Sequence, residues 1–210
     1  MKTVAVIDYG MSNLRSVSKA LEFVADDDWQ VLVTSELHTI LQADKVVFPG
    51  QGAIGNCISL LKQTGLYEAI QQALAQKPFL GLCLGLQTLL TMSEESGGTA
   101  GFNWAAGNVK RFCSPLYDGQ TQLKIPHMGW NQVQQTTPHE LWKDIPDNSR
   151  FYFVHSYYVA PEDESIITGT TTYSIPFTSA IAKDNVFAVQ FHPEKSQNVG
   201  LTLMKNFLQW

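Results

Sequence analysis

The sequence has few cysteines, no long apolar run and no cluster of basic residues. Its three cysteines, at positions 57, 83 and 113, form no C-x-x-C pair and are odd in number. We therefore expect no disulfide framework and a cytoplasmic location. The longest apolar region, residues 78–92, is interrupted by Gln87 and by glycines. A bilayer-spanning helix needs about 20 apolar residues, so we expect no membrane association, and we find no signal-peptide pattern.

Charge and composition narrow the class of protein further. There are 14 basic and 19 acidic residues, for a formal net charge of −5, which makes nucleic acid an improbable ligand. Hydrophobic residues make up 44% and charged residues 16%, as in an ordinary folded protein. We expect one domain over residues 1–210, because this length fits the larger α/β domains and supports a sizeable core.

The first half of the chain alternates strand and helix patterns. Short β-branched or apolar runs predict strands at residues 3–7, 31–33, 45–48 and 79–83. Apolar residues at helical spacing predict helices at residues 13–24, 54–61, 66–74 and 84–92. Such alternation indicates a parallel sheet with helices on both faces.

The second half is dominated by strand patterns. Predicted strands cover residues 109–112, 129–134, 151–159, 166–172, 179–182 and 186–190, with turn signals such as Asp118-Gly119 and Asp184-Asn185 between them. A last helix is predicted at residues 197–208. We therefore expect an α/β fold in which a mostly parallel, doubly wound sheet is extended by antiparallel strands.

A glycine-flanked cysteine is the first candidate for chemistry. Gly81-Leu82-Cys83-Leu84-Gly85 lies between a predicted strand and a predicted helix, which is the G-x-nucleophile-x-G pattern with cysteine as the nucleophile. The N-terminus of the following helix would favour a thiolate there. A structural cysteine, buried between glycines that packing requires, is the alternative interpretation.

A His-Pro-Glu segment is the second candidate. In extended chain, side chains two residues apart project to the same side, so His192 and Glu194 can act together. A carboxylate that orients an imidazole is what a thiol nucleophile requires. A solvated turn before the last helix is the alternative.

The segment at residues 48–52 is the third candidate. Gly50 and Gly52 follow a predicted strand and could turn backbone N–H groups toward a developing oxyanion, although a plain connecting turn would look the same. Together, the three segments place a nucleophile, a base with its orienter and an oxyanion loop at strand ends, where open α/β sheets bind ligands.

Four of the five histidines lie outside these segments. His127 could be a ligand or an interface residue, but no metal-spaced partner is near it in the sequence, so we expect no metal site. His155 is either a hydrogen-bonded core histidine or part of a pocket wall. His38 and His139 stand among polar residues and are expected at the surface.

These segments resemble the class I (triad) glutamine amidotransferases. More narrowly, they resemble the glutaminase subunits of imidazole glycerol phosphate synthases, nearly end to end. The resemblance is carried by residues 8–17, 81–87, 93–96, 126–131, 152–157 and 190–196. Gln51 departs from it, because the family usually has a small apolar residue at that place in the oxyanion loop.

The resemblance implies a role for each matching residue. Cys83 would be the nucleophile, His192 the general base and acid, and Glu194 the orienter of the histidine. The oxyanion and substrate-binding groups would come from Gly50, Gly52, Leu84, Gln87, Glu95, Ser156 and Tyr157. The partner interface, where ammonia leaves, would include Asn13, Trp130 and Lys195.

The resemblance also implies a partner. The chain would form a heterodimer with a (β/α)₈-barrel cyclase subunit, to which it would pass the ammonia released from glutamine, without any cofactor. Two alternatives remain open from the sequence. One is a paralogous glutaminase that supplies ammonia to a different synthase, and the other is a non-catalytic regulatory module of the same fold.

Overall fold

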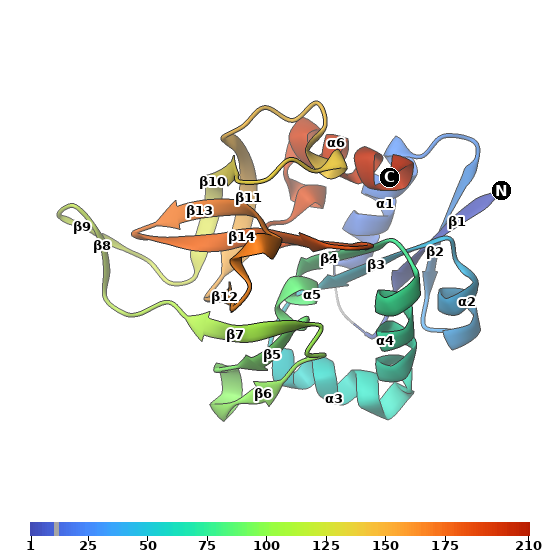
Figure 1. The fold of residues 1–210 in the computed structure, drawn as a ribbon, viewed down its shortest axis with the longest axis horizontal. Helices are drawn as coiled ribbons and strands as arrows, with labels where there is room; N and C mark the ends of the chain where they lie inside the picture. Colours follow the sequence, from blue (N-terminus) through green and yellow to red (C-terminus); the bar gives the residue numbers. More distant parts are fainter. Residues whose placement is uncertain (11–12) are drawn as a thin grey trace.

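A large twisted sheet forms the centre of the molecule. The computed structural model describes residues 1–10 and 13–210. Five neighbouring strands of the sheet run parallel (Figure 1), in the order β2 (Trp29–Thr34), β1 (Lys2–Ile7), β3 (Lys45–Gly50), β4 (Phe79–Cys83) and β15 (Val186–Val189). The predicted parallel core is therefore present.

Helices cover both faces of this parallel part (Figure 1). On one face lie α1 (Leu14–Val24) and α6 (Gln197–Gln209), and on the other α2 (Leu37–Gln42), α3 (Ile54–Thr64) and α4 (Leu66–Gln76). The side chains of β1 show why: Val4 and Val6 pack in the cluster that includes α1 and α6, while Ala5 and Ile7 pack in the cluster that includes α3 and α4. A strand buried on both faces has no polar side, as its sequence indicates.

Mostly antiparallel strands extend the sheet beyond β15. The path continues through β14 (Ile175–Lys183), β12 (Tyr157–Pro161), β7 (Ala105–Arg111), β5 (Leu90–Ser93) and β6 (Thr99–Ala100). A branch runs from β14 through β13 (Ile167–Tyr173) to β10 (His127–Gln135) and β11 (Ser149–His155). A separate hairpin of β8 (Leu116–Asp118) and β9 (Thr121–Leu123) projects at one end of the molecule (Figure 1).

Short 3₁₀ helices complete the description. They are η1 (Glu95–Gly97), η2 (Glu140–Trp142), η3 (Glu164–Ile166) and η4 (Pro193–Lys195). The α/β architecture, with a mostly parallel sheet extended by antiparallel strands, confirms the predicted fold class.

The predicted helix at residues 84–92 was wrong. Helix α5 (Leu84–Gln87) has one turn, and the chain then becomes strand β5, which pairs with β7 and β6. A short apolar run fits a buried helix and a buried strand equally well. Pairing with strands that lie later in the sequence decides between them. Helix α2 and strands β5, β6, β8 and β9 were not predicted.

Two further expectations need correction. The single strand predicted at residues 151–159 is two strands, β11 and β12, separated at Ser156, because β11 pairs with β10 while β12 pairs with β7 and β14. His139 is half-buried rather than at the surface, since its ring packs against Phe187 and Trp210. Burial lowers the pKa of His139, while the charge of Glu140 acts in the opposite direction.

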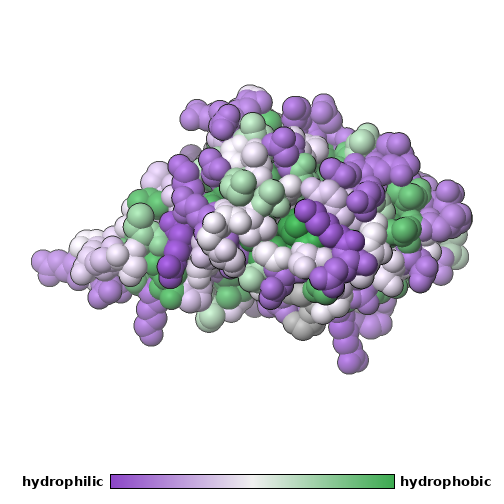
Figure 2. Space-filling model, turned by 90° about the horizontal axis from the view of Figure 1, so that it is seen from below, coloured by the Kyte–Doolittle hydropathy of each residue, from purple (hydrophilic) through white to green (hydrophobic). Residues whose placement is uncertain are grey.

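The surface mixes polar side chains with small apolar patches. On the face seen in Figure 2, hydrophilic side chains surround several separate apolar areas. Large apolar side chains that are exposed include Tyr117, Met128 and Trp130. Within residues 1–10 and 13–210, none of the helices combines the length and the apolar character that crossing a membrane requires.

Candidate active site

Three neighbouring parallel strands deliver the candidate segments to one edge of the sheet. In the register of β3 and β4, Gly50 lies beside Cys83, and in the register of β4 and β15, Leu82 lies beside Val189. The chain after β15 continues into His192 and Glu194. The segment at residues 48–52, the cysteine and the His-Pro-Glu segment therefore meet at the carboxyl ends of the strands, as predicted.

Cys83 stands on a strained turn between β4 and α5. Its backbone has φ 54° and ψ −102°, which is unusual for a residue with a side chain. The flanking glycines make this turn possible. A Cβ on Gly85 would lie 2.1 Å from the carbonyl oxygen of Phe48, and one on Gly81 would lie 3.2 Å from the backbone of Gly85. The G-x-C-x-G pattern is thus required by close backbone packing around the sulfur.

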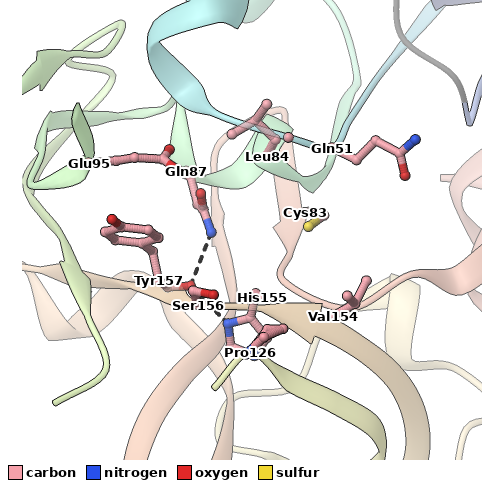
Figure 3. A pocket seen from close by; sticks show the side chains of 11 residues that line it. Gln51, Cys83, Leu84, Gln87, Glu95, Pro126, Val154, His155, Ser156 and Tyr157 are labelled. Atoms are coloured by element: carbon pink, nitrogen blue, oxygen red, sulfur yellow. Dashed lines mark hydrogen bonds between the residues drawn. The ribbon is translucent and has the colours of Figure 1, made fainter. Parts of the chain in front are cut away.

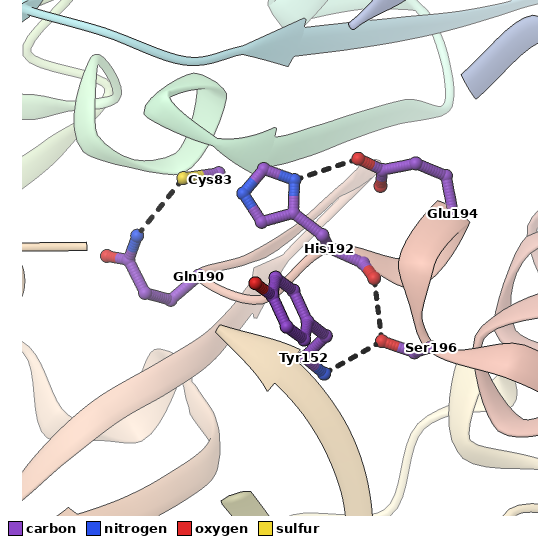
Figure 4. Close-up of polar contacts among 6 residues, drawn as sticks. All are labelled: Cys83, Tyr152, Gln190, His192, Glu194 and Ser196. Atoms are coloured by element: carbon purple, nitrogen blue, oxygen red, sulfur yellow. Dashed lines mark hydrogen bonds and ion pairs between the residues drawn. The ribbon is translucent and has the colours of Figure 1, made fainter. Parts of the chain in front are cut away.

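His192 and Glu194 form a fully buried pair. Nδ1 of His192 lies 2.8 Å from Oε1 of Glu194, and both side chains are 0% exposed (Figure 4). The backbone around them is also fixed: the N–H of His192 donates to the carbonyl of Tyr152, and the hydroxyl of Ser196 donates to the carbonyl of His192. With Nδ1 held by the carboxylate, Nε2 is left to face the cysteine.

The imidazole of His192 points toward Cys83 (Figure 4). Burial alone would lower the pKa of His192, but the nearby Cys83 sulfur and the Glu194 carboxylate outweigh burial and raise it to about 10. Nε2 is close enough to the sulfur for this electrostatic effect. Among the described residues, however, no partner of Nε2 is aligned as a hydrogen bond. The arrangement places a charged imidazole beside the sulfur, ready to give up a proton.

A cavity of about 500 Å³ opens onto the sulfur. Its wall is formed by Gln51, Gly52, Cys83, Leu84, Gln87, Glu95, Pro126, Val154, His155, Ser156 and Tyr157 (Figure 3). Six predicted oxyanion or substrate residues are among them, and His155 forms part of the wall. A volume of this size accommodates an amino acid.

The polar groups of the cavity are themselves held in place. The carboxamide of Gln87 donates to the carbonyl of Tyr157 at 3.1 Å and to Oε1 of Gln190 at 3.2 Å. Glu95 accepts a hydrogen bond from the N–H of Ile54, the first residue of α3, at 2.8 Å. The cavity thus presents a carboxylate, which can pair with an ammonium group, and an anchored carboxamide.

The predicted oxyanion loop packs directly on the turn that carries the cysteine. A Cβ on Gly50 would lie 2.8 Å from Cβ of Leu84 and 2.6 Å from the hydroxyl of Tyr9. Gly50 is therefore behind the cavity wall, where only a glycine lets the two backbone segments approach. Gly52 lines the cavity with φ +94°, a conformation that favours glycine.

Comparison with known proteins identifies the family. The sequence model described as glutamine amidotransferase class-I matches residues 5–210. The chain belongs to the class I glutamine amidotransferases. Within them it is similar to proteins named imidazole glycerol phosphate synthase subunit HisH. The one from Hydrogenovibrio crunogenus is 51% identical over 100% of this chain and 97% of its own. The one from Nitrosococcus oceani is 54% identical over 100% and 98%.

Solved structures agree on the fold. A protein described as a glutamine amidotransferase is 13% identical, with a TM-score of 0.72 over 98% of this chain and 97% of its own. A protein from Thermoplasma acidophilum, described as part of a GMP synthase, is 16% identical, with a TM-score of 0.71 over 100% and 93%. The resemblance to this amidotransferase family, read from the sequence segments, is confirmed.

The amidotransferase residues predicted to face a partner lie at different depths. Trp130 is 42% exposed and Lys195 is exposed, and both contact Tyr152: the Trp130 ring lies 6.1 Å from its ring and the Lys195 ammonium 5.9 Å. Asn13 is buried at the start of α1, and its amide has no hydrogen-bond partner among the described residues. The structure therefore groups Trp130 and Lys195 on the surface and leaves Asn13 beneath it.

Gln190 has no role in the predicted site, although it contacts the predicted nucleophile Cys83. Its Nε2 lies 3.6 Å from the sulfur of Cys83, and its Oε1 accepts from Gln87 (Figure 4). Gln190 stands two residues before His192 on extended chain, so the same-side rule used for Glu194 could have found it. No group of three metal-ligating side chains occurs in the part of the chain that the structure describes.

Proposed function

We propose that Cys83, His192 and Glu194 hydrolyse glutamine to glutamate and ammonia. Membership of the HisH group makes the chain the glutaminase subunit of imidazole glycerol phosphate synthase, in histidine biosynthesis. The observation that carries the residue assignment is the strained cysteine, which faces a buried imidazole–carboxylate pair and a cavity of amino-acid size.

The reaction begins with attack of the Cys83 thiolate on the side-chain amide carbon of glutamine. A tetrahedral intermediate forms, and its oxyanion accepts hydrogen bonds from the backbone N–H groups of Leu84 and the Gly52 region. His192 gives its proton to the departing ammonia, which leaves a thioester on Cys83. Neutral His192 then takes a proton from water, and the hydroxide attacks the thioester to release glutamate.

The substrate is held by groups that line the cavity. The carboxylate of Glu95 pairs with the ammonium group of glutamine, while Gln87 and the backbone at Ser156 and Tyr157 orient its amino-acid end. Glu194 touches neither substrate nor sulfur. It is a positioning residue that fixes the tautomer of His192 and stabilises the imidazolium form.

The ammonia passes to a (β/α)₈-barrel cyclase subunit in a heterodimer. Ammonia released into water would become ammonium, which is no nucleophile, so a direct passage between the subunits preserves it. The exposed Trp130 and Lys195 are the proposed contact surface, and buried Asn13, at the start of α1, is proposed to lie near the ammonia exit. We further propose a cytoplasmic enzyme, on the grounds of its cysteine content, that uses no cofactor. Its net charge of −5 argues against nucleic acid as a ligand, and the interrupted apolar region at residues 78–92 argues against a membrane.

Labelling of the nucleophile tests the residue assignment. An electrophilic glutamine analogue should modify Cys83 in the wild-type chain, and mass spectrometry of peptides should show modification at that position. Cys83→Ala should abolish labelling and glutaminase activity in the complex with the cyclase subunit. Cys113→Ser is the matched control, since Cys113 is exposed and outside the cavity. Full activity in Cys83→Ala would refute the assignment.

Reconstitution tests the partner. The purified chain is mixed with a cyclase subunit, glutamine is added, and glutamate is measured with and without the cyclase ligand. Glutamate production that depends on the cyclase supports the proposal. Glutaminase activity that the cyclase leaves unchanged would favour a paralogous ammonia donor, and no activity with any partner would favour a non-catalytic module.

A further inference from the structure

A chain of hydrogen bonds joins two buried histidines to the wall of the glutamine cavity. His127 on β10 and His155 on β11 lie directly opposite each other in the strand register, and Nδ1 of His127 is 2.9 Å from Nε2 of His155. Nδ1 of His155 lies 2.8 Å from the carbonyl oxygen of Tyr157, and Nε2 of His127 lies 3.2 Å from Nδ2 of Asn131. We call Asn131, His127, His155 and the Tyr157 carbonyl the histidine chain.

The direction of every bond in the histidine chain is fixed from both ends. At the inner end, a carbonyl can only accept, so Nδ1 of His155 carries the proton and its Nε2 accepts from His127. At the outer end, Nδ2 of Asn131 donates to the carbonyl of Thr172, which identifies it as the amide nitrogen, so Nε2 of His127 accepts. Both ends require the same tautomers.

Both histidines are neutral in this arrangement. A second proton on either ring would point at a donor, since Nε2 of His127 faces an amide nitrogen and Nε2 of His155 faces an N–H group. Burial acts in the same direction and lowers the pKa of His127 to about 4 and that of His155 to about 3. The chain is therefore a set of directed, uncharged hydrogen bonds.

The inner end of the histidine chain meets the substrate groups. The carbonyl of Tyr157 accepts two hydrogen bonds, one from His155 and one from Gln87 (Figure 3). Gln87 also donates to Gln190, which contacts the Cys83 sulfur. Tyr157 is the first residue of β12, opposite Arg111 of β7 and directly after the break at Ser156. Its carbonyl accepts from side chains, and His155 anchors it together with Gln87.

We propose that His127 and His155 are positioning residues, which fix the Tyr157 carbonyl and the Gln87 carboxamide for glutamine binding. This inference rests on the proposed glutaminase function. Packing alone would not require two histidines here: the ring of His127 stacks on Phe153 and Tyr173 in surroundings where an apolar side chain of similar size would avoid the cost of a buried polar group. The directed bonds are what the imidazoles add.

Paired substitutions separate positioning from packing. In His155→Gln the amide reaches the place of Nε2 and leaves the Tyr157 carbonyl without its donor, whereas in His155→Asn the amide nitrogen lies near the place of Nδ1 and can still donate. His38→Gln is the matched control, because His38 is exposed on α2. Steady-state glutaminase kinetics are measured in the complex with the cyclase subunit, together with the melting temperature of each variant.

We expect His155→Gln to raise KM for glutamine about tenfold, the effect of one lost positioning hydrogen bond, with kcat changed less than about threefold. His155→Asn should restore KM to within about threefold of wild type, and His38→Gln should leave it unchanged. The double variant His127→Gln/His155→Gln should be no worse than His155→Gln, since both break the same chain.

Three results would overturn the inference. One is an unchanged KM in a folded His155→Gln enzyme, and another is an equal loss in His155→Gln and His155→Asn, which would indicate packing alone. If His155→Gln fails to fold, the same comparison is made at His127, whose Nδ1 is bonded to His155. Equal KM values in His127→Gln and His127→Asn would then reject the inference. A wild-type complex without glutaminase activity would instead overturn the proposed function, and the inference with it.

Discussion

Two regions of this molecule hold buried histidines in opposite states. At the carboxyl end of β15, His192 lies between the Cys83 sulfur and the Glu194 carboxylate, which raise its pKa to about 10 despite burial. On β10 and β11, the hydrogen bonds that the described residues make to His127 and His155 involve a carbonyl, an amide and the two rings themselves, all uncharged, and burial lowers the pKa of His155 to about 3. Burial lowers the pKa of all three imidazoles, and only at His192 do anionic neighbours outweigh it.

The difference in charge state corresponds to two different roles for a buried histidine, proton transfer and positioning. A histidine that must take and release a proton needs anionic neighbours, so that both of its protonation states are accessible during a reaction. A histidine that must hold a carbonyl in place needs neutral neighbours, so that its tautomer never changes. The four substitution and pH experiments below probe this contrast, beginning with the largest expected effect.

His192→Asn should have the largest effect. The variant removes the only imidazole that faces the sulfur among the described residues, so neither protonation of ammonia nor activation of water can proceed normally. We expect kcat for glutamine hydrolysis in the complex to fall by about 10⁴-fold. His155→Asn is the comparison variant, with a kcat near that of wild type. Equal losses in the two variants would erase the distinction between the regions.

Glu194→Gln should have a smaller effect on rate. The amide keeps the shape of the side chain but removes the negative charge, which is one of the causes that raise the pKa of His192. We expect kcat to fall by about 10²-fold, with KM for glutamine little changed. In an NMR titration, the pKa of His192 should move down from about 10. A pKa that stays in place would show that Glu194 does not support the charge.

The contributions of His155 and His192 to the free energy of unfolding should be lost at opposite ends of the pH scale. His155 stays neutral in the folded chain, so its contribution is present above an unfolded pKa of about 6.5 and is lost as pH falls toward 3. His192 stays charged, so its contribution is present below about 6.5 and is lost as pH rises through 10. Each group contributes a slope of at most about 1.4 kcal/mol per pH unit.

Urea unfolding from pH 4 to pH 10 measures these slopes. In His155→Asn, the free energy of unfolding should fall less steeply as pH decreases below about 6.5 than it does in wild type. In Glu194→Gln, it should fall less steeply as pH increases above about 6.5. Carboxylates elsewhere in the chain contribute to both curves, so only the difference between each variant and wild type is diagnostic. If His155→Asn changed the alkaline slope instead, or Glu194→Gln the acid slope, the assigned charge states would be wrong.

The sequence predicts the charged region better than the neutral one. Cys83, His192 and Glu194 each follow a short apolar strand, and strand ends converge by the rules of parallel sheets, so their proximity could be predicted. His127 and His155 meet only because β10 and β11 pair in one particular register, across 28 residues of sequence. Single-residue patterns carry no information about that register.

The incorrect predictions have the same cause. The apolar run at residues 84–92 looks helical by itself, yet residues 90–93 become strand β5 because β7 is available to pair with them. The aromatic run at residues 151–159 looks like one strand, yet its two halves pair with different neighbours. In each instance, contacts with distant parts of the chain outweigh local preference.

Gln190→Met should have the smallest effect. It tests the side chain that connects the two regions by hydrogen bonds. Gln190 accepts from Gln87 and donates to the Cys83 sulfur, so it is the one described side chain that hydrogen-bonds to both. Methionine matches its length without its polarity. A sulfur acceptor at 3.6 Å is weak, and Gln87 keeps its bond to Tyr157, so we expect kcat/KM to fall only about fivefold. Steady-state kinetics and the rate of Cys83 labelling should fall together, because both report the orientation of the sulfur. A loss as large as that of His192→Asn would mean that the two regions act as one.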